Sequence, residues 1–407
     1  MSRRNYGYYS YSRRRSFPWA TILIALAVVA IVAGILVGFN YKRIKLMMKG
    51  YSWKEASIVL DMSDTNIDTL LKEDKIDNLV VWMEYTDDAS YYDEYDQYAK
   101  LFPKMDEDKV VKAMDVFVDE VYDGLKDLGY KDSVIWELLE TQSNSELKYL
   151  INHNLAYSDI SDFVDYKYFK CSNVTAYKDA VAKYGNEAYA VNITNFPFII
   201  SEYEDDSHYT ILDPDNITTL VKKGFYYDSD YVPDDLREVN IAKNPACQYP
   251  MLRDEAATAL EEMTEAAKLE GYYIVLNSGY RSYSDQSAVY SEYEAKYGGQ
   301  YAAEYVAAPG ASEHQSGLGV DLTSQSVVDG TKITFGDTAE YQWVIQHCQE
   351  YGFIIRFEEA ESNITGIAHE PWHLRYVGKD AAEACVENDW TYEEYCLYNS
   401  VLPEIDY

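Results

Sequence analysis

Apolar and polar residues are distributed in three different ways along the chain, and each pattern predicts a different kind of structure. Residues 17–39 form an unbroken apolar run. From there to about Asp213, apolar residues recur every three or four positions, as at Val110, Met114 and Phe117, which is the spacing of an amphipathic helix. Beyond Asp213, glycine and proline become denser and short strand-like runs such as YYIVLNS and GVDLTS occur. The patterns predict a mostly helical region followed by an α+β domain.

The first apolar run is long enough to cross a bilayer, since about 20 apolar residues match the thickness of the hydrocarbon core. Basic residues follow it directly, which favours a retained signal anchor over a cleaved signal peptide. Arginines and lysines are equally frequent on its two sides, so the positive-inside rule does not choose an orientation. We expect a cytoplasmic tail over 1–16 and a transmembrane signal anchor over 17–40. We expect the rest of the chain to lie outside the cell, on the basis of the site chemistry described below.

Two segments of the helical region begin alike, at Gly50 and at Gly129. Each starts with Gly-Tyr and continues with an apolar helix, a polar break and a second helix that ends in leucine. This weak internal repeat predicts an extracytoplasmic helical stalk over 41–212, which would serve as a spacer or would bind the cell wall or a partner protein. The alternative is two unrelated helix pairs.

Composition excludes one class of partner. The chain has 69 acidic and 35 basic residues and a formal net charge of -34, which would repel a phosphate backbone, so no nucleic acid is expected. Its 42 tyrosines are spread over the whole length; we interpret them as half-buried packing, with a carbohydrate-facing surface as the alternative. The five cysteines are interpreted as small buried residues, with a disulfide between Cys385 and Cys396 as the alternative.

Three short segments beyond Asp213 together contain the side chains of a hydrolytic metal site: SGYRSYSDQ, SEHQSGLGVD and EPWH. A catalytic zinc ion takes three protein ligands and keeps one position for water. His314, Asp321 and His373 would supply these ligands. Glycines between the first two allow the chain to bring both side chains to one point.

Two further side chains have the chemistry that peptide hydrolysis needs. Glu370 stands three residues before His373, where it would take a proton from the attacking water and give it to the leaving amine. Arg281 would bind the terminal carboxylate of a substrate or the oxyanion of the tetrahedral intermediate, or would form a structural ion pair. Trp372 is interpreted mainly as core packing.

The sequence HEPWH, from His369 to His373, also matches the HExxH pattern of zinc proteases. That pattern requires a helix that carries both histidines on one face. Pro371 would fall inside the helical turn, where it removes a donor and clashes with the preceding carbonyl. We therefore reject His369 as a ligand and expect a strand at this position.

The motif SxHxxGxxxD, followed by ExxH and preceded by SGYRS, resembles the VanY-type D-alanyl-D-alanine carboxypeptidases and the related L,D-carboxypeptidases. The likeness extends from YVPDDL, which starts at Tyr231, to Gly378. It implies a small antiparallel sheet with helices, so that 213–407 would be a zinc carboxypeptidase domain. One departure is Gly319, where the family usually has alanine.

The resemblance also implies a role for each candidate residue. The zinc ligands would be His314, Asp321 and His373, and the catalytic base would be Glu370. The substrate-polarising arginine would be Arg281. Gln286 and Ser312 would contact the substrate.

The expected substrate is the peptidoglycan stem peptide, and the expected reaction is release of its C-terminal D-amino acid. The residues leave open whether the enzyme prefers D,D or L,D bonds. The alternatives are a peptidoglycan endopeptidase, which would use the same zinc chemistry, and a non-catalytic ectodomain that binds the wall or a partner.

Overall fold

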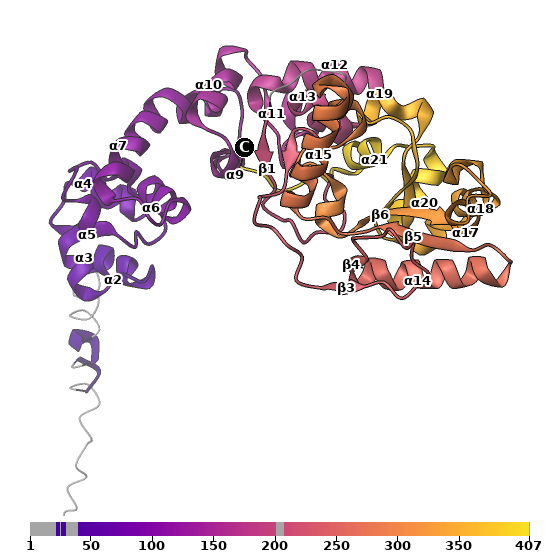
Figure 1. Cartoon of the computed structure of the whole chain (residues 1–407). Helices are drawn as coiled ribbons and strands as arrows, with labels where there is room; N and C mark the ends of the chain where they lie inside the picture. Colours follow the sequence, from indigo (N-terminus) through magenta and orange to yellow (C-terminus); the bar gives the residue numbers. More distant parts are fainter. Residues whose placement is uncertain (1–21, 25, 30–39, 201–206, 407) are drawn as a thin grey trace, which may run out of the picture. The chain divides into compact units, whose positions relative to one another are not determined.

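The protein is described here from a computed structural model that covers residues 22–24, 26–29, 40–200 and 207–406 (Figure 1). The chain divides into two compact units, Met1–Asn144 and Ser145–Tyr407. Each unit is described by itself.

The first unit is helical. Its predicted amphipathic stripe is confirmed, because Val110, Met114, Phe117, Val121 and Leu125 are all buried. A π-helical turn at Val118–Tyr122 lies within this stripe. The α-helices are α2 (Tyr41–Met48), α3 (Trp53–Leu60), α4 (Asp64–Leu70), α5 (Leu79–Trp82), α6 (Tyr92–Leu101), α7 (Glu107–Phe117), α8 (Asp123–Asp127) and α9 (Asp132–Thr141).

The two similar segments also begin with the same backbone conformation. Gly50 and Gly129 have φ angles of 103° and 86°, which glycine adopts without steric cost. The tyrosine after each glycine is buried, and two short helices follow it: α3 and α4 in the first copy, α9 and α10 (Asn144–Asn152) in the second.

Most of the predicted signal anchor, 17–40, falls outside the described ranges. Among the residues that are described, no helix is long and apolar enough to cross a membrane. Membrane anchoring and the extracellular location therefore stay predictions.

The second unit contains a four-stranded antiparallel sheet, which confirms the α+β prediction. Its strand order is β5 (Ile274–Ser278), β6 (Gly319–Ser324), β8 (Glu370–Tyr376) and β7 (Phe353–Phe357). Helices α14 (Asp254–Leu269) and α18 (Ala339–His347) bury apolar side chains with the sheet in one core (Figure 1). The sheet thus has a rigid support under its central pair, β6 and β8.

A second core joins the helices after Ser145 to the C-terminal helices. Tyr189 and Phe196 pack in one cluster with Tyr392 and Leu397, and the buried Asn192 amide donates to the Leu397 carbonyl at 3.1 Å. The unit that holds the sheet therefore begins well before Asp213, where the domain boundary was expected. The helices of this layer are α12 (Val174–Tyr184), α13 (Glu187–Asn195), α20 (Lys379–Asn388) and α21 (Tyr392–Asn399).

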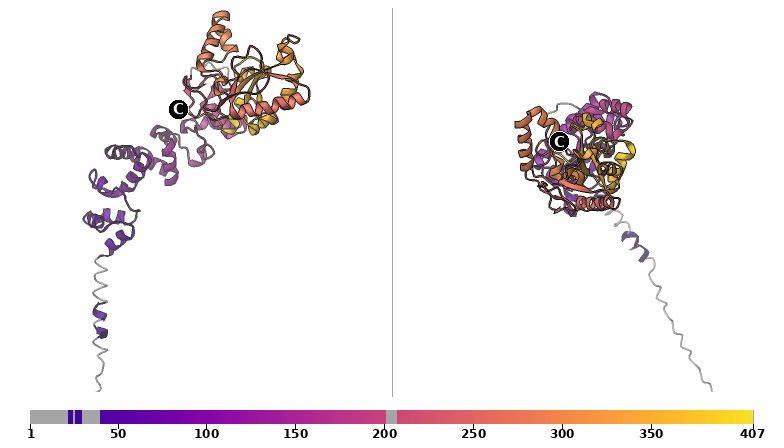
Figure 2. Two further views of the ribbon diagram at one scale, coloured as in Figure 1. Left: turned by 60° about the horizontal axis from the view of Figure 1, so that its bottom comes forward. Right: turned by 45° about the vertical axis from the view of Figure 1, so that its right-hand side comes forward.

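A helical hairpin, α15 (Tyr283–Tyr297) and α16 (Gly299–Tyr305), extends from the same unit, and α15 is visible as a projecting orange helix in Figure 2. Residues 291–300 are all exposed. The other α-helices and strands that the structure describes in this unit are α11 (Tyr157–Ile160), β1 (Tyr209–Thr210), β2 (Phe225–Tyr226), β3 (Leu236–Glu238), β4 (Met251–Arg253), α17 (Gln325–Val328) and α19 (Ser362–Thr365).

Candidate active site

The central strands and one short turn bring the three predicted metal ligands together. Asp321 on β6 is paired in register with His373 on β8. His314 lies in a 3-10 turn, Glu313–Ser316, that ends at Gly317 with a φ of 69°. A Cβ at Gly317 would lie 2.8 Å from a methyl carbon of Leu236. Only glycine suits this turn, which aims His314 at the paired strands.

The donor atoms of His314, Asp321 and His373 all lie within 4.8 Å of one another. The Nδ1 of His314 is 2.7 Å from the carbonyl oxygen of Gly279, and because that oxygen can only accept, Nδ1 carries the proton. The Nε2 of His314 is therefore left with a lone pair, 3.4 Å from Asp321 Oδ2. On the other side of the carboxylate, His373 Nδ1 lies 2.9 Å from Asp321 Oδ1. Two imidazoles and a carboxylate form a donor set that suits a catalytic zinc ion.

A buried carboxylate, Glu313, lies behind His373. Its Oε2 accepts from His373 Nε2 at 3.2 Å. Its Oε1 accepts from Arg356 Nε at 2.8 Å and forms an ion pair with Arg375 Nη1 at 3.2 Å. A carboxylate in this position fixes the tautomer and the orientation of a ligating histidine.

The guanidinium of Arg356 is held on its other edge by Glu393 of α21. The two bonds from Arg356 to the Glu393 carboxylate measure 3.0 and 2.8 Å. Glu393 also accepts from Lys222 Nζ at 3.3 Å, and the same ammonium donates to the carbonyl of Ile199 at 2.7 Å. A continuous buried network therefore extends from the candidate ligand His373 to the helical layer.

These neighbours change the proton affinities of the site. Burial lowers the pKa of His373, but its hydrogen bonds to Asp321 and Glu313 outweigh burial and raise that pKa to about 9. Burial lowers the pKa of His314. Burial raises the pKa of Glu370 to about 7, with the negative charges of Asp321 and Glu313 acting in the same direction. Glu370 therefore exchanges a proton near neutral pH, as a general base must.

Arg281 is placed by its surroundings to meet a substrate. Its Nη1 donates to Gln286 Oε1 at 2.8 Å and its Nη2 to Ser278 Oγ at 3.2 Å. Its buried Nε has no hydrogen-bond partner within the described part of the chain. The Gln286 amide nitrogen is itself bonded to the Ala307 carbonyl at 2.7 Å. Gln286 therefore braces Arg281, and its predicted contact with substrate, like that of the buried Ser312, stays a prediction.

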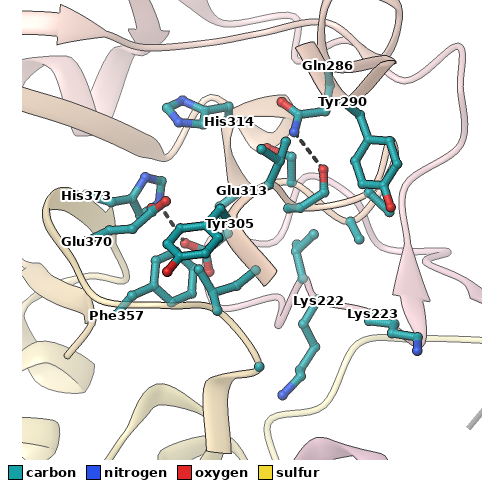
Figure 3. Close-up of a pocket in the computed structure, with 18 of the residues that line it drawn as sticks. Lys222, Lys223, Gln286, Tyr290, Tyr305, Glu313, His314, Phe357, Glu370 and His373 are labelled. Atoms are coloured by element: carbon teal, nitrogen blue, oxygen red, sulfur yellow. Dashed lines mark hydrogen bonds and ion pairs between the residues drawn. The ribbon is translucent and has the colours of Figure 1, made fainter. Parts of the chain in front are cut away.

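The three candidate ligands border one cavity of about 670 Å³, together with Glu370, Arg281, Gln286 and Ser312. In Figure 3, His314, Glu370 and His373 lie on one side of the cavity, and Gln286 and Tyr290 lie on another. The cavity thus joins the metal-ligand cluster to the α15–α16 hairpin.

Comparisons with known proteins agree with this chemistry. The VanY family, D-alanyl-D-alanine carboxypeptidase, matches residues 250–379. Over 188 residues the chain is 44% identical to YodJ of Bacillus subtilis (strain 168), a predicted carboxypeptidase, and the match covers 46% of this chain and 69% of YodJ. The chain belongs to the VanY family. The resemblance inferred from the three motifs is therefore confirmed.

Two other relatives add detail. VanXYC of Enterococcus gallinarum, a bifunctional D-Ala-D-Ala dipeptidase and carboxypeptidase, is 40% identical over 150 residues, which is 36% of this chain and 78% of VanXYC. A VanY D,D-pentapeptidase from a VanB-type resistance cassette was solved with Zn(II); it is 28% identical, with 44% of this chain and 98% of that one covered and a TM-score of 0.38.

Two expectations about the EPWH segment of this VanY-family chain are now decided. The segment is strand β8, so the HExxH interpretation fails as expected, and His369 Nδ1 instead lies 3.1 Å from the Phe357 carbonyl oxygen. The interpretation of Trp372 as core packing was wrong. Trp372 is 37% exposed and lines the cavity together with Glu370 and His373.

Glu313 is the functional residue that the sequence did not reveal. It stands next to His314 in the motif, yet it supports the other histidine, His373. The departure at Gly319 bears on the same residue, since a Cβ there would lie 3.0 Å from the backbone carbonyl carbon of Glu313. Glycine at this position relieves a tight contact beneath the turn.

Proposed function

We propose that this chain is a zinc-dependent carboxypeptidase that releases the C-terminal D-amino acid from peptidoglycan stem peptides. The observation that carries the proposal is the convergence of His314, Asp321 and His373 on one point, beside Glu370 and Arg281 in one cavity. Membership of the VanY family supports the same reaction.

The donor set fits zinc. His314 offers Nε2, because its Nδ1 proton is given to a carbonyl, and His373 offers Nδ1, because its Nε2 faces Glu313. With Asp321 these are three protein ligands, which leaves a position for water. Bound zinc would polarise the scissile carbonyl and lower the pKa of a water molecule to near 7.

Glu370 moves the protons of the reaction. A carboxyl whose pKa is about 7 accepts the proton of the attacking water as the oxygen–carbon bond forms. It returns that proton to the amine as the carbon–nitrogen bond breaks, so the D-amino acid leaves with a neutral amine.

Arg281 favours a carboxypeptidase over the endopeptidase alternative. The Arg281 guanidinium lines the cavity, with its Nη2 3.9 Å from Asp321 Oδ2, and a free carboxylate beside it would gain a charge-assisted hydrogen bond. An internal peptide bond offers no such charge. The intact set of catalytic side chains likewise disfavours the non-catalytic ectodomain. We further propose that residues 17–40 anchor the enzyme in the membrane with the site outside the cell, where this substrate is found.

The proposal is tested by assaying D-alanine release from a muramyl pentapeptide and from the corresponding tetrapeptide. We expect chelator-sensitive release from at least one of them, and the preferred stem distinguishes D,D from L,D specificity. Amidation of the terminal carboxylate should abolish release. If zinc-loaded protein releases D-alanine from neither stem but cleaves cross-linked stem dimers, the endopeptidase alternative is favoured. Binding to peptidoglycan without cleavage of any stem would favour the ectodomain.

A further inference from the structure

The α15–α16 hairpin carries a row of tyrosines that the proposed reaction does not use. Consecutive rings contact one another: the centroids of Tyr293 and Tyr297 are 5.7 Å apart, those of Tyr297 and Tyr301 4.8 Å, and those of Tyr301 and Tyr305 4.3 Å. Each of these four residues is between 36% and 49% exposed. The row is therefore a continuous aromatic surface in contact with solvent.

Packing does not account for this surface. Residues 291–300 are all exposed, and Gln286, near the base of the hairpin, is the buried residue of α15. An exposed row of large aromatic side chains beside a binding site marks a place where a partner docks. The hairpin thus presents the tyrosines outward and gains little core from them.

The row is continuous with the active site. Tyr293, Tyr301 and Tyr305 line the same cavity as the metal ligands, and so does Tyr290, one turn before Tyr293 on the same helix (Figure 3). Helix α15 begins beside Arg281 and ends at Tyr297, next to the hairpin turn. A ligand that is held at Arg281 can therefore continue along the tyrosines.

The dimensions identify which part of the substrate reaches the row. The 15 residues of α15 give it a length of about 22 Å at 1.5 Å per residue. A stem peptide of five residues spans at most roughly 18 Å when extended. If its C-terminus lies at Arg281, its first residue, and the sugar to which that residue is attached, lie beside the outer half of the helix.

We propose that the tyrosine row, Tyr293, Tyr297, Tyr301 and Tyr305, binds the glycan strand from which the stem peptide hangs. Sugar rings have apolar C–H faces that stack on aromatic rings and hydroxyl edges that exchange hydrogen bonds with phenols, so tyrosine suits both. The inference rests on the proposed function, because it assumes that the stem enters the cavity with its carboxylate at Arg281. The hairpin then selects stems that are attached to polymeric glycan.

The test compares two substrates with the full-length protein: the free stem pentapeptide, which is soluble and carries no sugar, and uncross-linked glycan strands that carry pentapeptide stems. The variant Tyr297→Ala changes a residue outside the cavity lining. We expect it to raise KM for the polymer about twofold to tenfold, the range for one aromatic contact, and to leave the soluble peptide unaffected. Tyr297→Phe, which keeps the ring, should retain most of the polymer affinity. Tyr273→Ala removes another exposed tyrosine, one that lies outside the cavity, and should change neither substrate.

Three outcomes would overturn the inference: an unchanged KM for the polymer, an equal loss in Tyr273→Ala, or an equal loss on the soluble peptide. Binding of stem-free glycan strands to metal-depleted protein gives a second measurement, which Tyr297→Ala should weaken by the same factor. If the wild-type protein released no D-alanine from either substrate, the proposed function would fail. The binding measurement with stem-free glycan strands would still show whether the tyrosine row binds glycan.

Discussion

The carboxylate behind His373 allows the role of the buried network to be measured directly. Glu313→Gln keeps the size and one acceptor oxygen of the side chain but removes its charge. His373 Nε2 would then face a neutral amide in place of a carboxylate at 3.2 Å, which weakens the bond that orients the ring. Loss of such an outer partner usually weakens metal binding about 10- to 100-fold.

Stability will change as well, so the two effects have to be separated. Glu313 is shared by two buried guanidiniums, those of Arg356 and Arg375. Breaking a buried pair by removing one partner costs about 3–5 kcal/mol, a large part of the roughly 5–15 kcal/mol that holds a domain folded. Zinc affinity must therefore be measured by chelator competition on protein that circular dichroism shows to be folded, well below its melting temperature.

The chain contains a matched control. Glu393 is as deeply buried as Glu313 and bonds the same guanidinium through two nitrogens, but no contact joins it to a metal ligand among the described residues. Glu393→Gln should therefore lower the free energy of unfolding by a similar amount and change the zinc dissociation constant by less than about twofold, since second-shell effects act through direct hydrogen bonds.

Comparing the zinc affinities of the two variants tests whether Glu313 orients His373. If Glu393→Gln weakens zinc binding as much as Glu313→Gln does, then zinc affinity reports only a loosened core, and the orienting role of Glu313 is refuted. Normal zinc affinity in Glu313→Gln would refute it equally.

Three further predictions follow from the site. Glu370→Gln should keep its zinc and lose about 10²- to 10⁴-fold in kcat, and wild-type kcat/KM should fall below about pH 7, where Glu370, with a pKa of about 7, becomes protonated. His314→Ala should lose zinc in an elemental assay, whereas His369→Ala should retain it; equal loss would revive the HExxH interpretation. Because His373 has a pKa of about 9 in the metal-free site, it is protonated at pH 6, and zinc uptake should release about one proton from it, measurable by titration calorimetry in buffers of different ionisation enthalpy. Apparent zinc affinity should accordingly rise as the pH is raised toward 9, and a pH-independent affinity would show that His373 is not a ligand.

Local pattern was enough to predict which three side chains converge on the candidate metal site, and the structure shows why. Asp321 and His373 occupy adjacent strands whose β-character is visible in GVDLTS and LRYV. Pro371 excludes a helix at the second of them. His314 is placed by a turn that Gly317 alone permits. Each of these determinants lies within a few residues of the ligand it positions, so a single sequence contains the information.

The network behind the ligands could not be predicted in this way. Glu313, Arg356 and Glu393 are far apart along the chain, and each taken alone is a common charged residue that would be placed at the surface. Only the pairing of strands and the packing of α21 bring them together. The exposed position of Trp372 was missed for a related reason, since a tryptophan in an apolar strand gives no sign of which face it occupies.

The expected domain boundary at Asp213 shows the same limit on a larger scale. Helices α12 and α13 have the amphipathic spacing of a stalk, and periodicity identifies an apolar face without saying what covers it. In the structure the apolar face of α13 packs against α21, which also carries Glu393. Lys222 links this layer to the site, because its ammonium donates both to the Ile199 carbonyl and to Glu393. A fragment that starts at Asp213 would lack both this carbonyl and Phe196, and would expose residues that Phe196 covers, such as Phe225, so the helices after Ser145 are part of the structure that holds His373 in place.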